Sequence, residues 1–336
     1  MLRKTFLRLG LGAGAACLAN GCARRTWSER IVVSARPTLY MAPFYLAHES
    51  GYFREAGLDL ELQSIEDGYQ TVALLAGRKL DVAISSITSS LVSAIGNGAD
   101  VRIVAGLRYL SRDCSDTGTL YASRAKFPRG LDSLATLKSD LRGKRVALNS
   151  RGNANEFYLD TLLDNAGLTE ADVQIALVRF SEAVAAVRKG RIDVFMSPEQ
   201  FSVQSIAGSP DLIRGLGMMQ VLPGFQYSFL AFGSHLLNAD PQIGARFLHA
   251  HLKGVADFRN GKTPRYLDDF ARSNGLDVGR VRASCRDNCP PDGAIRRDSI
   301  QRMAQWFVKK GYCSREVSDK QIVDSRFLDG MRKEES

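Results

Sequence analysis

Short apolar runs alternate with amphipathic stretches along the chain from Ile31 onward. The apolar runs predict strands at residues 31–35, 58–62, 80–84, 101–107, 144–149, 173–180, 191–196 and 211–217. A turn or a candidate helix follows each strand of the first set, and the same rhythm restarts with the second. This alternation is typical of the α/β class, in which helices cover mostly parallel sheets.

The strands fall into two sets, separated by a less regular basic stretch at 123–143. We therefore predict two lobes, which also suits a length of 336 residues. A first crossing is expected near 119–123 and a return near 226–232. The predicted parts are residues 22–118 for the beginning of lobe 1, 119–225 for lobe 2, and 226–336 for the return to lobe 1. Helices are expected at 240–258, 264–274, 296–311 and 318–331, packed back on lobe 1.

The first 21 residues resemble an export signal, with three basic residues ahead of an apolar run too short to span a bilayer. The sequence LANGC at 18–22 resembles a bacterial lipobox, in which Cys22 becomes the lipidated first residue. A plain cleaved signal peptide is the alternative. The segment RKTFLR at 3–8 resembles a twin-arginine signal with Lys4 in place of the second arginine, so both Sec and Tat export stay open. We expect a periplasmic or cell-surface protein, held at the membrane through Cys22.

Composition adds two exclusions. A hydrophobic content of 45% and a charged content of 24% are those of a globular protein. The formal net charge is +9, and removal of the leader takes away three positive charges. The remaining excess is scattered and forms no basic stripe with interleaved aromatic residues, so we expect no nucleic-acid partner.

Four cysteines follow the leader, and an even number in an exported chain predicts disulfides. The candidates are Cys114, Cys285, Cys289 and Cys313. Three pairings are possible, and the sequence does not choose among them. A zinc site is the competing interpretation, but no histidine has ligand spacing to these cysteines. We expect no metal and no cofactor. His249 and His251 point to different faces of one predicted helix and are interpreted as surface or packing residues.

Five segments carry a family resemblance: residues 42–63, 74–106, 140–168, 183–200 and 306–329. In this order along the chain, they resemble the solute-binding family of sulfonate, taurine, nitrate and thiamine-pyrimidine (NMT1/THI5-like) ABC importers. The resemblance implies a type II periplasmic-binding-protein fold, with two Rossmann-like lobes joined by a hinge and a small molecule enclosed between them. It also implies an ABC permease and ATPase as partners of a monomeric binding protein.

Candidate ligand contacts lie where predicted strands end and helices begin, because free backbone N–H groups collect there and favour anionic or polar groups. The candidates are Tyr40, Tyr69, Ser85, Ser86, Thr88, Arg151, Gly152, Asn153, Ser197 and Glu199. The hydroxyl groups at 85–88 can contact a ligand or only cap a helix. Tyr69 can stack on a solute or pack in the core. Gly152 lets the backbone approach a ligand closely.

Two charged candidates carry the ligand hypothesis. Arg151 can hold a carboxylate or sulfonate with two hydrogen bonds, or it can be an exposed arginine on the rim. Glu199 can accept a bond from a ligand amine or amidine, or it can merely favour a helix start beside Pro198. If both face the cleft, the ligand is zwitterionic, or carries an acid at one end and a nitrogen donor at the other.

Two other functions are compatible with this fold class. Fungal relatives of the pyrimidine branch are enzymes with a CCCFC segment, which is absent from this sequence, as are the GxSxG, HExxH and GxxxxGK motifs. We therefore expect no enzymatic activity. A ligand-sensing receptor subunit is the second rival, and the sequence alone does not separate it from an importer component.

Overall fold

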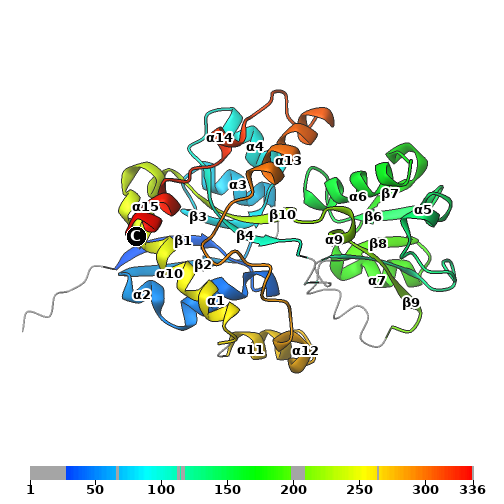
Figure 1. Cartoon of the computed structure of the whole chain (residues 1–336), viewed down its shortest axis with the longest axis horizontal. Coiled ribbons are helices and arrows are strands. Elements are labelled where there is room, and N and C mark those ends of the chain that lie inside the picture. Colours follow the sequence, from blue (N-terminus) through cyan, green and yellow to red (C-terminus); the bar gives the residue numbers. More distant parts are fainter. Residues whose placement is uncertain are drawn as a thin grey trace, which may run out of the picture.

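The computed structural model describes residues 28–65, 68–111, 114, 118–197, 209–262 and 265–334. The predicted leader, the lipidation residue Cys22 and the candidate Glu199 lie outside the described residues. The described chain forms two five-stranded sheets with helices packed around each. Figure 1 shows the two units side by side along the long axis, with residues of the second sheet in green. The predicted α/β class is confirmed.

The first sheet has the strand order β2-β1-β3-β10-β4. Its strands are β1 (Glu29–Ser34), β2 (Leu58–Gln63), β3 (Val82–Ser86), β4 (Arg102–Tyr109) and β10 (Gln226–Phe232). β1 pairs in parallel with β2 and β3, whereas β10 runs antiparallel between β3 and β4. β4 and β10 are buried along nearly their whole length, as expected for strands covered by helices on both faces.

The second sheet has the order β7-β6-β8-β5-β9. Its strands are β5 (Thr119–Ser123), β6 (Arg145–Leu148), β7 (Gln174–Leu177), β8 (Val194–Ser197) and β9 (Leu212–Gly217). β6 pairs in parallel with β7 and β8, and β5 runs antiparallel between β8 and β9. The two sheets therefore have the same architecture, with one antiparallel strand in the fourth place of each.

Helices connect the strands and cover both sheets. Around the first sheet lie α1 (Ala42–Glu49), α2 (Tyr52–Glu55), α3 (Gly68–Ala76), α4 (Ser89–Gly96), α10 (Pro241–Arg259), α11 (Tyr266–Ser273), α12 (Val278–Arg282), α13 (Arg297–Lys309), α14 (Asp319–Ile322) and α15 (Arg326–Glu334). Around the second lie α5 (Leu134–Leu141), α6 (Ala154–Asn165), α7 (Phe180–Arg188) and α9 (Met218–Val221). Three short turns of other helix types are η1 (Leu39–Met41), η2 (Glu170–Asp172) and η3 (His235–Ala239). In the part of the chain described here, no helix has both the length and the apolar character needed to span a membrane.

Two predicted elements differ from the structure. The strand expected at 173–180 ends at Leu177, and α7 already begins at Phe180. The helix expected at 318–331 is broken into α14 and α15, because Val323 leaves the helix and pairs with Ile103 beside β4. The first difference matters for the site, because it moves Arg179 from a strand to the start of a helix.

His251 on α10 is buried inside the first unit, while His249 is exposed. The side chain is 1% exposed, and neither ring nitrogen has a hydrogen-bond partner in the described structure. Burial lowers the pKa of His251 to about 4 from its ordinary 6.5. The prediction that these two histidines face different sides of the helix is confirmed.

We expect the stability of the protein to fall as the pH drops below about 6.5, because the unfolded chain binds a proton there that the folded chain does not. Between pH 7.5 and 5, His251 alone should cost about 2 kcal/mol. His251→Leu should remove this contribution while keeping the volume. Urea unfolding of both proteins at the two pH values measures it. If the free energy of unfolding falls equally in both proteins between the two pH values, His251 does not contribute to the pH dependence.

Candidate functional site

A cavity of about 710 Å³ lies between the two sheets. We call it the central cavity. On the side of the first sheet it is lined by residues from the ends of β1 and β3, the start of α3 and the start of β10. On the other side it is lined by Asn149, Ser150 and Asn153 between β6 and α6, by Ala154 and Asn155 at the start of α6, by residues 179–181 at the start of α7, and by Met196 of β8. Its volume is in the range of small-molecule sites.

Six of the sequence-predicted ligand contacts line the central cavity: Tyr40, Tyr69, Ser85, Ser86, Thr88 and Asn153. Two of them also cap the helices that begin there. The Thr88 Oγ1 accepts a bond from Leu91 N at 3.3 Å at the start of α4. The Asn153 Oδ1 accepts bonds from Asn155 N and Glu156 N at 3.0 and 3.2 Å at the start of α6. Both N-termini are therefore fixed at the cavity wall.

The structure gives Arg151 a different role from the predicted anion clamp. Arg151 is not among the residues that line the cavity, and its guanidinium donates to the carboxylates of Glu156 and Glu170. Partial burial disfavours the charge, but these two bonds outweigh it and raise the pKa of Arg151. A guanidinium held by two carboxylates has little capacity left for a ligand. Glu199, the other half of the expected zwitterion-binding pair, lies outside the described residues, so that pair stays a prediction.

Ser197 and Gly152 also lie outside the cavity lining. Ser197 is 1% exposed at the end of β8. Gly152 has a φ of +66°, a conformation that favours glycine, and its carbonyl accepts a bond from Ser89 N at 2.9 Å. A Cβ atom on Gly152 would lie 2.4 Å from Ser89 Oγ and 2.5 Å from Tyr69 Oη. Gly152 therefore permits close contact between the two units rather than close approach to a ligand.

The start of α4 and the loop before α6 form a continuous contact beside the cavity, which we call the α4–α6 contact. Tyr69 Oη donates to the carbonyl of Arg151 at 2.8 Å and lies 3.3 Å from Ser89 Oγ. Thr88 and Asn153 form an isolated β-bridge. The contacts Tyr69–Arg151 and Thr88–Asn153 join the first unit to the second. The contact between Tyr69 and Ser89 lies within the first unit. The lining of the cavity and the contact between the units thus share residues.

A second group of contacts extends the interface behind α6. Tyr312 Oη donates to Glu156 Oε1 at 2.7 Å, and Lys310 Nζ donates to Asp160 at 2.8 Å and to Glu170 at 3.1 Å. Burial and the bond to Glu156 raise the pKa of Tyr312. Trp306 of α13 contributes an indole N–H that donates to Asp160 at 2.8 Å. The segment that follows α13 therefore holds α6 through charged and polar bonds.

Sequence reasoning missed many residues that line the cavity, among them Arg36, Arg179, Phe180, Tyr227 and Ser228. Arg36 follows β1, and Arg179 follows β7 at the start of α7. The rule that selected the other candidates, that ligands meet the carboxyl ends of strands, applies to both arginines. Arg179 was missed because the strand was extended to residue 180. Tyr227 and Ser228 lie at the start of β10, the expected return crossing, and a rule about the carboxyl ends of strands does not select them.

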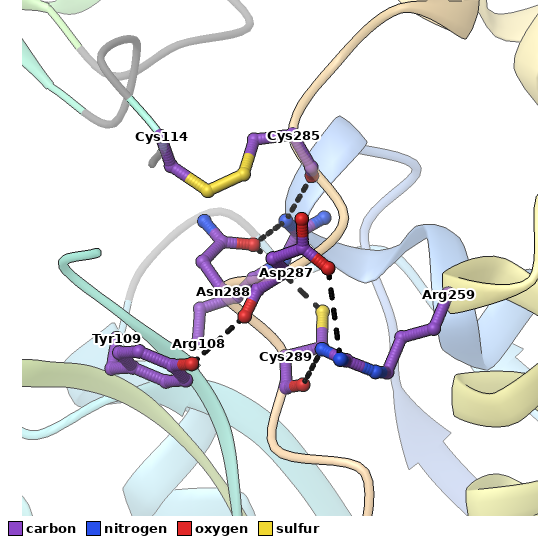
Figure 2. The surroundings of a disulfide bond; sticks show 8 residues. All are labelled: Arg108, Tyr109, Cys114, Arg259, Cys285, Asp287, Asn288 and Cys289. Carbon is purple, nitrogen blue, oxygen red and sulfur yellow. Dashed lines mark hydrogen bonds and ion pairs between the residues drawn. A yellow bond between two sulfur atoms is a disulfide. The ribbon is translucent and has the colours of Figure 1, made fainter. Parts of the chain in front are cut away.

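Cys114 and Cys285 form a disulfide, with their Cα atoms 5.4 Å apart (Figure 2). This settles the open pairing for two of the four candidates. Cys289 and Cys313 are buried thiols, so the prediction that all four pair is wrong. The Cys313 Sγ atom lies beside α4, at hydrogen-bond distance (3.2 Å) from Ser93 Oγ. The loop that holds Cys289 is a separate part of the chain. The described residues contain no cluster of three or more His, Cys, Asp or Glu side chains suited to a metal ion.

The disulfide is linked to the cavity through Arg108, which is 1% exposed at the end of β4. The Arg108 guanidinium donates to Cys285 O at 3.1 Å, to Leu39 O at 3.2 Å and to Asn288 Oδ1. It also contacts Tyr40 O at 3.4 Å. Figure 2 shows Arg108 and Asn288 below the disulfide that Cys285 forms with Cys114. The loop at 285–289 therefore fixes the backbone from which the Tyr40 side chain reaches the cavity.

The NMT1/THI5 like family model matches residues 38–261. The riboflavin-binding protein RibY of Chloroflexus aurantiacus is 25% identical over 237 residues, which cover 68% of this chain and 61% of that protein. The 4-amino-5-hydroxymethyl-2-methylpyrimidine phosphate synthase THI12 of Saccharomyces cerevisiae is 28% identical over 159 residues, 47% of this chain and 42% of the synthase. The match therefore spans less than two thirds of either relative.

The fold matches that of the periplasmic aliphatic sulphonate binding protein SsuA from Escherichia coli. The TM-score is 0.69 at 18% identity, over 90% of this chain and 99% of SsuA. The predicted type II periplasmic-binding-protein fold is confirmed by this similarity.

Proposed function

Since the chain belongs to the NMT1/THI5-like family, we propose that it is the extracytoplasmic solute-binding component of an ABC importer. The central cavity is the observation that carries this proposal. It has about 710 Å³, is lined from both sheets, and receives the capped N-termini of α4 and α6. Helix N-termini with serine, threonine and asparagine side chains replace the water around a small polar or anionic molecule.

The proposed lobes are residues 22–118 with 226–336, and residues 119–225. They close over the solute by hinge motion. The arrangement described above corresponds to the closed form, because the α4–α6 contact joins the two units directly beside the cavity. In this account Tyr69 serves both the ligand and closure, while Arg151 and Gly152 serve closure alone.

The proposed setting is that of an exported protein anchored through Cys22, which works as a monomer and delivers its solute to a membrane permease with its ATPase. The fold that it shares with the periplasmic aliphatic sulphonate binding protein SsuA supports this setting. So does the resemblance of residues 1–22 to a lipoprotein leader.

Binding without chemistry is favoured over synthase activity, although the yeast relative is an enzyme. The described residues that line the central cavity include no lysine, histidine, cysteine, aspartate or glutamate. These residue types most often supply the general base that a catalytic hydroxyl needs. The lining instead offers hydroxyl groups, amides, aromatic rings and two arginines, which suit recognition.

A thermal-shift screen of the mature chain tests the proposal. The panel contains alkanesulfonates, taurine, nitrate, aminopyrimidines, riboflavin and aromatic carboxylates. A true solute at 100 times its Kd should raise the stability by about 2.7 kcal/mol, which appears as a higher Tm. If no compound in the panel raises the Tm, the solute-binding proposal is contradicted.

A further inference from the structure

Two arginines face the central cavity from opposite sides. Arg36 lies in the loop after β1 in the first unit, and Arg179 directly precedes α7 in the second. Arg36 is half-buried and Arg179 is exposed. Burial raises the pKa of Tyr40, and the positive charge of nearby Arg36 opposes this shift without cancelling it. Arg36 and Tyr40 both line the central cavity.

Neither guanidinium has a carboxylate partner among the described residues, unlike Arg145, Arg151 and Arg188, which are each paired. The described lining also lacks any acidic side chain. A ligand that displaces water from both guanidinium groups must supply the missing negative charge, because an unpaired charge is costly to desolvate.

Two more features of the cavity wall also favour a negatively charged ligand. Helix α7 begins at the cavity with no side-chain cap, so its positive end adds to the charge of Arg179. Ser228 on β10 is 2% exposed, lines the cavity, and its Oγ has no hydrogen-bond partner in the described structure. A buried hydroxyl without a partner is rare in a native protein, and a ligand oxygen would satisfy it.

Aromatic side chains also line the central cavity. Tyr40, Tyr69 and Tyr227 come from the first unit and Phe180 from the second. Rings of this kind pack well against a planar aromatic ligand. An aliphatic ligand of similar charge would leave these faces poorly packed.

We propose that the central cavity binds an aromatic acid with two negative charges, one held by Arg36 and the other by Arg179 at the start of α7. This inference rests on the proposed function, which it makes more specific. It predicts that a planar dianion binds more tightly than a planar monoanion or a flexible aliphatic dianion, since only the first satisfies both arginines and the rings.

Titration calorimetry of the mature chain tests this preference with named probes. Terephthalate and 4-sulfobenzoate are the planar dianions, benzoate is the planar monoanion, and adipate is the aliphatic dianion. We expect either planar dianion to have a Kd at least tenfold lower than those of benzoate and adipate. Equal affinity for terephthalate and benzoate, or tighter binding of adipate, would overturn the inference.

Two variants test the residues. Arg36→Gln and Arg179→Gln should each weaken terephthalate at least tenfold, while the ratio between terephthalate and benzoate affinities falls toward one. Arg191→Gln is the matched control, because Arg191 is an exposed arginine of the second unit that does not line the cavity. It should leave the Kd of terephthalate unchanged. If both cavity variants behave like the control, the arginines are not the ligand's anion sites.

Riboflavin and taurine in the same titrations separate this inference from the proposed function. Tight binding of either, with no binding of the planar dianions, overturns the dianion inference and leaves solute binding intact. If neither they nor any of the acids bind, the inference fails, and the broader thermal-shift screen decides the proposed function.

Discussion

Replacing Gly152 with alanine should weaken binding of the solute about 10- to 100-fold, the largest effect that we expect from a single methyl group in this chain. The added Cβ would lie 2.4 Å from Ser89 Oγ and 2.5 Å from Tyr69 Oη, far inside normal contact distance. Overpacking of this kind costs about 1 to 3 kcal/mol, and here the cost falls on the closed form. The Kd of a solute identified by the thermal-shift screen, measured by calorimetry, gives the size of the effect.

Gly190→Ala is a matched control for this change. Gly190 has a φ of +65°, almost that of Gly152, and a Cβ there would meet nothing within 4 Å. Both variants carry the same backbone strain, so their difference reports the steric clash alone. If Gly152→Ala binds the solute as tightly as Gly190→Ala does, the α4–α6 contact has no part in closure. Adding Ser89→Ala to Gly152→Ala should restore part of the lost affinity.

Loss of the disulfide between Cys114 and Cys285 should lower the stability by about 3 to 5 kcal/mol, since the bond closes a long loop in the unfolded chain. The two cysteines are 171 residues apart. We also expect weaker solute binding, because the loop at 285–289 holds Arg108 and, through it, the backbone at Leu39 and Tyr40.

The comparison is made by thermal unfolding of the native chain and of the double variant Cys114→Ser with Cys285→Ser, each with and without a phosphine reductant. The reductant should lower the Tm of the native chain and leave that of the variant unchanged. An equal response of the two proteins would mean that the bond between these cysteines does not account for the stability.

Most of the fold could be predicted from the sequence, because apolar runs of strand length between amphipathic stretches identify a buried strand almost directly. All ten strands lie at or near an expected position. The errors lie at the ends of elements. The strand expected at 173–180 included residues 178–180, which hid the start of α7 at Phe180. Val323 breaks the last predicted helix through a contact with Ile103, and such a long-range contact leaves no local pattern.

The site was predictable where it depends on local rules and unpredictable where it depends on long-range pairing. Thr88 and Asn153 follow strands and cap helices, and both line the cavity. Arg151 follows the same rule, but Glu170 of η2, which is distant in sequence, forms an ion pair with its guanidinium. The partner of Cys114 likewise depends on a packing of β4 against the tail that the spacing of cysteines does not encode.

Small-angle X-ray scattering of the mature chain, with and without a solute that raises its Tm, tests the central claim most directly. The account predicts that the solute lowers the radius of gyration of the native chain, because two lobes close over the central cavity, and that Gly152→Ala reduces this change. A radius of gyration that stays the same when the site is saturated would contradict closure of two lobes on a bound solute.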